Sequence, residues 1–147
     1  MAYLLALLLF TTSSFAKDDW HSASVGAKNS CKVKGKKKEF VVLTDFDGDG
    51  ALDIARLQEN KKTHRMRVAV WMNGSAEPLV LREDDGSLGL SYLTLALPGE
   101  RAAVSAGKKI KYKISLPSIA YGKCGSPEFI FQWDKARGKF TSAVVAD

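Results

Sequence analysis

Alternation of polar and apolar residues with a period of two is the feature that most constrains the fold of this chain. In residues 109–114 lysines alternate with Ile, Tyr and Ile, and in residues 65–72 Met and Val residues occupy every second position. Because successive side chains of a strand point to opposite faces, such segments are typical of half-buried strands. No segment shows a sustained 3.6-residue pattern. The sequence therefore predicts an all-β, mainly antiparallel single domain of about seven or eight short strands.

Turn signals separate these segments. Asn73-Gly74 and Pro98-Gly99 each end an apolar run. Residues 134–138 lie between the aromatic segment 129–133 and a second apolar run at 140–145, which predicts a hairpin near the C-terminus. Short helices around residues 20–28 and 100–106 are also compatible with the sequence.

The beginning of the chain has the form of a secretory signal peptide. Residues 1–16 carry no charged side chain, include an apolar run at 3–10, and end in Ser14-Phe15-Ala16 before a charged segment. We expect cleavage after Ala16 and a periplasmic or secreted protein. An uncleaved membrane anchor is the alternative, although the run is shorter than the ~20 residues that span a bilayer.

The mature chain would then consist of a polar, basic segment at residues 17–38 and a β-domain at residues 39–147, without a transmembrane segment. Its two cysteines, Cys31 and Cys124, are an even pair. In an oxidising compartment such a pair favours a disulfide, and two buried free thiols are the alternative. The disulfide would close a loop of about ninety residues, worth roughly 4–5 kcal/mol in the chain-entropy model.

Residues 45–53 read Asp-Phe-Asp-Gly-Asp-Gly-Ala-Leu-Asp and are the segment most suited to binding an ion. Closely spaced carboxylates repel each other unless a cation lies between them, and Ca²⁺ prefers oxygen ligands of this kind. Gly50 permits a sharp bend after the third acid. The expected ligands of one ion are the side chains of Asp45, Asp47, Asp49 and Asp53 and the backbone carbonyl of Ala51. An acidic hairpin without a metal is the alternative.

The context of this segment distinguishes between families of calcium loops. The spacing matches the first nine positions of the helix-loop-helix calcium hand, but Arg56 occupies the twelfth position, where that motif has a glutamate. The flanks, 40–43 and 54–57, also predict strands. Phe-Asp-Gly-Asp-Gly-x-x-Asp-Ile between two strands resembles the calcium loops of FG-GAP and VCBS repeats.

This resemblance covers residues 39–58 and implies one structural, non-catalytic calcium ion that stiffens a β-hairpin, with the ligands named above. Only one clear copy is present, and a β-propeller needs several blades, so the chain alone is not expected to form a propeller. More loosely, the chain resembles small exported bacterial proteins that carry one such loop near the front, most of which have no assigned function.

The formal net charge of +6 favours anionic partners. Five cationic residues lie on the polar faces of two predicted strands: Arg65, Arg67, Lys109, Lys111 and Lys113. If these strands are neighbours, the residues form a face for an acidic protein or an anionic component of the cell envelope. An ordinary solvated surface is the alternative. We do not expect an exported protein to bind nucleic acid.

Catalytic motifs are missing from the sequence. It contains no Gly-x-Ser-x-Gly, no His-Glu-x-x-His and no glycine-rich phosphate loop. Four clustered acids also suit ion binding better than catalysis. The sequence therefore favours an exported, non-catalytic calcium-binding module. Two alternatives remain: an inhibitor or immunity-type protein that blocks an envelope-acting enzyme, and a small metal-assisted hydrolase.

Overall fold

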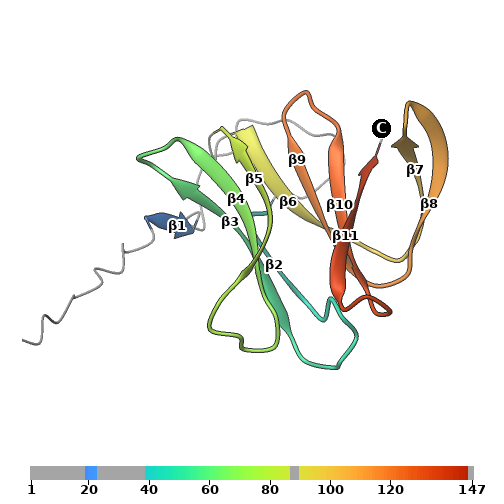
Figure 1. The fold of residues 1–147 in the computed structure, drawn as a ribbon, viewed down its shortest axis with the longest axis horizontal. Helices are drawn as coiled ribbons and strands as arrows, with labels where there is room; N and C mark the ends of the chain where they lie inside the picture. Colours follow the sequence, from blue (N-terminus) through green and yellow to red (C-terminus); the bar gives the residue numbers. More distant parts are fainter. Residues whose placement is uncertain (1–18, 23–38, 87–89, 146–147) are drawn as a thin grey trace, which may run out of the picture.

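The computed structural model describes residues 19–22, 39–86 and 90–145, which form two antiparallel β-sheets (Figure 1). The all-β prediction is confirmed, with eleven strands rather than seven or eight. These strands are β1 (Trp20–Ser22), β2 (Val41–Thr44), β3 (Asp53–Asn60), β4 (Arg65–Trp71), β5 (Leu79–Asp85), β6 (Ser91–Ala96), β7 (Gly99–Ser105), β8 (Lys108–Ile114), β9 (Ser118–Lys123), β10 (Glu128–Asp134) and β11 (Lys139–Val145). Within the described ranges, no helix is long and apolar enough to cross a bilayer.

The additional strands lie in segments without an alternating pattern. The helix considered over residues 100–106 is wrong, because Gly99–Ser105 pairs as β7 along the whole length of β8. The helix considered over residues 20–28 begins instead with a strand, β1, and its other residues lie outside the described part of the chain. Trp20–Ser22 pairs with residues 58–60 of β3. A short part of the predicted N-terminal segment 17–38 therefore pairs with the edge of β3.

Sheet A contains β1, β3, β4 and β5 in that order, and β2 also pairs with β3. Strands β1 and β2 share one edge of β3, because β1 pairs with residues 58–60 and β2 with residues 53–56. Sheet B has the order β6-β9-β10-β11-β7-β8. The predicted C-terminal hairpin is confirmed as β10 and β11, which pair from Glu128↔Val145 to Asp134↔Lys139.

The main hydrophobic core lies between the two sheets. Sheet A contributes Leu57 and Val68, and sheet B contributes Ile119, Tyr121 and Phe131, all of them buried. The period of two explains this arrangement, since alternate residues of β3, β4 and β9 point toward the opposite sheet.

A second, smaller core lies on the other face of sheet B. Ile130 stands between Phe129 and Phe131 in β10 and therefore points away from the main core. It packs with Ala120, Val145 and, from the β7–β8 hairpin, Ile114. Strand β8 is the last strand of sheet B and lies far from sheet A (Figure 1).

Gly122 of β9 lies directly beneath the ring of Tyr92, its partner in β6. A Cβ at this position would overlap the ring carbons and the hydroxyl oxygen, and Tyr92 is buried at 3 % exposure. We expect Gly122→Ala to lower the free energy of unfolding by about 1–3 kcal/mol, as overpacking does in other cores. Urea denaturation measures this loss. The double variant Gly122→Ala/Tyr92→Leu should recover part of it, and additive losses would contradict the overlap.

Candidate metal centre

The acidic loop connects β2 to β3 as the sequence predicts, with a strand rather than a helix on each side. Thr44 pairs with Asp53 across the base of the loop, so both of its ends are held by the hairpin. The β10–β11 turn lies next to the loop (Figure 1), and the Lys135 side chain is the closest group to Gly48 in that turn.

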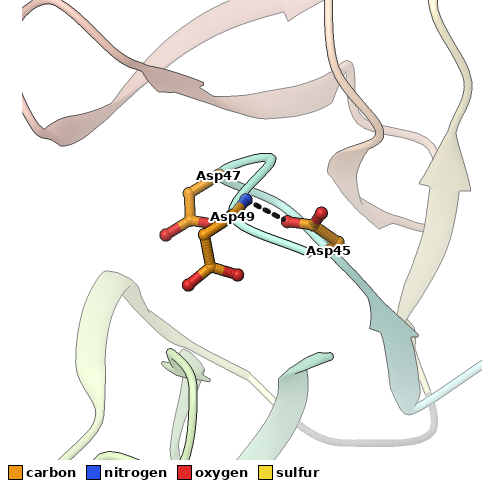
Figure 2. A group of neighbouring side chains, drawn as sticks. All are labelled: Asp45, Asp47 and Asp49. Carbon is orange, nitrogen blue, oxygen red and sulfur yellow. Dashed lines mark hydrogen bonds between the residues drawn. The ribbon is translucent and has the colours of Figure 1, made fainter. Parts of the chain in front are cut away.

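Three of the predicted ligands converge at this loop. One carboxylate oxygen from each of Asp45, Asp47 and Asp49 lies within 4.8 Å of the others (Figure 2). Asp49 is exposed and the other two are half-buried. Because hard cations bind carboxylate oxygens, this donor set fits Ca²⁺, and water that reaches the exposed Asp49 would complete its six to eight ligands.

Backbone amides of the loop hold these carboxylates in place. The Asp45 carboxylate accepts hydrogen bonds from the amides of Gly48 at 2.6 Å, Gly50 at 2.9 Å and Asp49 at 3.1 Å. The last of these bonds is drawn in Figure 2. The Asp47 carboxylate accepts from the Asp49 amide, and Asp49 accepts from the Ala51 amide. A carboxylate has about four lone-pair positions, so acceptor capacity remains for a cation.

The pKa values of two neighbouring acids in the loop are shifted in opposite directions. Hydrogen bonds from the Gly50 amide, and then from the Gly48 and Asp49 amides, lower the pKa of Asp45 despite its partial desolvation. Loss of solvent raises the pKa of Asp47, and the negative charges of Asp49 and Asp53 add to this effect. The amides therefore do not compensate the charge of the cluster fully, and a bound cation would reduce the remaining repulsion.

Glycine is required at two places in the loop. Gly48 has φ 74° and Gly50 has φ 90°, in the left-handed region that side chains disfavour. A Cβ on Gly48 would also lie 2.7 Å from the Lys135 ammonium nitrogen. The two glycines let the backbone turn sharply enough for its amides to face Asp45.

Asp53 has a structural role that the sequence did not reveal. Its side chain is fully buried, with Oδ2 accepting from the Phe46 amide and Oδ1 from the Asn73 amide, both at 2.8 Å. It is not one of the three acids that converge. Asp53 thus joins the acidic loop to the β4–β5 connection, and its role as a metal ligand, like that of the Ala51 carbonyl, stays a prediction.

Two further residues of the centre were missed by sequence reasoning. Phe46, between two acids, is fully buried in the main core and makes an edge-to-face contact with Phe140 at 6.2 Å. Asn73, which the sequence indicated as a turn residue, donates from its side-chain amide to Asp49 at 3.2 Å. A lone aromatic residue in an acidic loop was the available signal for Phe46. No local signal pointed from Asn73 to Asp49.

The five cationic residues predicted to share a face lie in different sheets. Arg65 and Arg67 belong to β4 in sheet A, whereas the three lysines belong to β8, at the edge of sheet B. Arg65 pairs with Glu83 at 3.1 Å and Lys111 with Glu100 at 3.4 Å. The strands are not neighbours, so the condition for a common cationic face is not met.

Cys124 follows β9, and its amide donates to the Leu90 carbonyl at 2.9 Å. Cys31 lies outside the described residues, so the Cys31–Cys124 disulfide stays a prediction. The predicted signal peptide and most of the basic segment 17–38 also lie outside them.

Comparison of the chain with family models, with curated proteins and with solved structures found no match. The resemblance to FG-GAP and VCBS calcium loops therefore rests on residues 39–58 alone.

Proposed function

We propose that this protein is an exported calcium-binding β-domain that acts as a non-catalytic binding module. The observation that carries the calcium proposal is the convergence of three carboxylates, from Asp45, Asp47 and Asp49, in a strand-flanked loop. The resemblance of this loop to FG-GAP and VCBS loops supports the same ion. The signal-peptide form of residues 1–16 and the cysteine pair support export to an oxidising compartment.

The ion would have a structural role. Asp49 contacts Asn73, and Asp53 accepts the Asn73 amide, so the loop is connected to the segment that follows β4. An ion at the three carboxylates would remove the repulsion between them and hold this connection in one arrangement. Extracellular calcium modules commonly have dissociation constants around 10⁻⁴–10⁻³ M, which suits an ion that stays bound outside the cell.

A catalytic role has less support at this site. Each acid of the loop already accepts backbone amides. The two histidines, His21 in β1 and His64 before β4, are exposed and lie outside the loop. A general base has to be within hydrogen-bond reach of the group that it activates. We therefore propose a binding module rather than a metal-assisted hydrolase.

Thermal unfolding in excess chelator and in about 10 mM calcium tests the metal site. Ten millimolar is a hundredfold excess over a dissociation constant of about 10⁻⁴ M. Binding should then add about 2.7 kcal/mol to the free energy of unfolding, which raises the melting temperature by several degrees. Magnesium at the same concentration should give a smaller shift, because it requires near-octahedral geometry at shorter distances.

The matched control is Asp49→Asn, which removes one charge from the exposed part of the cluster. This variant should fold but lose most of the calcium-dependent shift in melting temperature.

The protein is best purified from the periplasm. The intact mass of the purified protein then also reports cleavage after Ala16 and the Cys31–Cys124 disulfide. If neither protein responds to calcium, the loop is an acidic hairpin without a metal.

A further inference from the structure

The outer face of sheet A, remote from the main core, carries a groove of about 500 Å³. Its lining combines aromatic, cationic, amide, apolar and hydroxyl groups, from Trp71, Arg56, Gln58, Ile54, Leu52 and Ser75. Ile54 pairs with Trp71, and Gln58 pairs with Arg67 on the same face. This mixture of an aromatic wall with a few polar groups is typical of small-ligand sites.

Arg56 supplies positive charge to the lining of the groove. Its guanidinium lies 5.8 Å from the centre of the Trp71 ring. Among the residues that the structure describes, Arg56 forms no ion pair, whereas Arg65 on the same strand pair contacts Glu83 at 3.1 Å. A guanidinium beside an aromatic ring keeps its N–H edge available for two parallel hydrogen bonds to a carboxylate.

A second stack extends this face along the sheet. The Arg67 guanidinium lies 4.5 Å from the centre of the Trp20 ring and donates to the Gln58 carbonyl oxygen at 2.8 Å. Trp71 is opposite Ile54 and Trp20 is opposite Asn60, six positions further along β3. Six strand residues span about 20 Å, so the face is long enough for an extended ligand.

The rim of the groove is connected to the acidic loop. Gly74 and Ser75 line the groove and follow Asn73, which is held by both Asp49 and Asp53. Leu52, exposed at 70 %, lies between the acidic cluster and Asp53 in the sequence and forms another part of the lining. Order in the loop therefore affects both sides of the groove.

We propose that this groove binds an acidic saccharide. The carboxylate of one sugar unit would pair with Arg56, the apolar face of the ring would pack on Trp71 and Leu52, and hydroxyls would bond to Gln58 and Ser75. Single-stranded nucleic acid fits less well, because Arg56 is the one cation among the described residues that line the groove, whereas grooves for single strands carry positive charge along the whole backbone. The inference names the ligand of the proposed binding module and rests on that proposal.

Calorimetric titration of the mature protein tests the groove. The probes are a hexuronate oligosaccharide, a neutral hexose oligosaccharide of equal length and a single-stranded oligonucleotide. We expect saturable binding of the acidic sugar only. Arg56→Gln and Trp71→Leu should each weaken it about tenfold or more, because each removes a contact worth about 1.4 kcal/mol. Arg101→Gln, an equal charge change on β7 of sheet B, should leave affinity within about twofold.

Three results would overturn the inference: equal weakening by Arg56→Gln and Arg101→Gln, which indicates bulk charge; binding of the oligonucleotide without the sugar; or no binding of the acidic sugar. Each titration is done in chelator and in calcium. If the sugar binds but calcium does not raise the melting temperature, only the metal proposal is contradicted. If calcium raises the melting temperature but the sugar does not bind, only the saccharide proposal is contradicted.

Discussion

Replacing Asp53 with alanine is expected to lower the free energy of unfolding by about 3–6 kcal/mol in excess chelator. The buried carboxylate accepts two backbone amides, from Phe46 and Asn73, and hydrogen bonds to a charged group contribute about 1.5–3 kcal/mol each. Alanine leaves both amides without an acceptor at a site that excludes water. Urea denaturation followed by circular dichroism measures the loss.

The matched control is Asp85→Ala, at a side chain that is 97 % exposed. Surface substitutions of this kind change stability by less than about 0.5 kcal/mol. Because chelator is present throughout, a loss at Asp53 cannot come from a missing metal ligand. Similar small losses at both positions would mean that the two amides of the Asp53 site find water when the carboxylate is removed.

Phe46→Ala should lower the free energy of unfolding by about 3–5 kcal/mol, the usual range for removing a buried phenylalanine. The ring is fully buried in the main core, against Phe140, and attaches the acidic loop to that core. The variant should also bind calcium more weakly, since the carboxylates on either side of position 46 would no longer be held in place. Denaturant unfolding and a calcium titration measure the two effects.

Leu52→Ala is the control for Phe46, because it removes an apolar side chain from the same loop at a position that is 70 % exposed. We expect it to change stability by less than about 0.5 kcal/mol. If Phe46→Ala lowered the free energy of unfolding as little as Leu52→Ala does, the stability of the loop would not depend on its contact with the core.

The parts of the fold that the sequence could predict are those with a local pattern. Strands β4, β8 and β10 alternate clearly, and the β10–β11 hairpin has a turn segment between two apolar runs. Strand β7 reads Gly-Glu-Arg-Ala-Ala-Val-Ser and has no such pattern. It is a strand because β8 pairs along its whole length and because Ala103, within β7, is buried and pairs with Val145 of β11. Tertiary pairing decided its conformation.

The candidate centre also contains residues whose roles follow from local sequence and residues whose roles depend on distant contacts. Asp45, Asp47 and Asp49 lie within five residues, so their convergence depends on local turns and on two glycines that the sequence shows directly. The role of Asp53 depends on Asn73, twenty residues away, and that of Phe46 on the opposite sheet. Spacing alone cannot distinguish a carboxylate that faces a cation from one that accepts buried amides.

By itself, the sequence determined the all-β class, the strand-flanked loop and the acids that meet in it, because a pleat with a period of two and a tight turn are local properties of the chain. Only the tertiary structure decided which strands share a sheet. It separated Arg65 and Arg67 from the lysines of β8, and it brought Trp20, Arg56 and Trp71 onto one face. Strand order results from long-range pairing and burial on two sheets at once, which no short segment of sequence encodes.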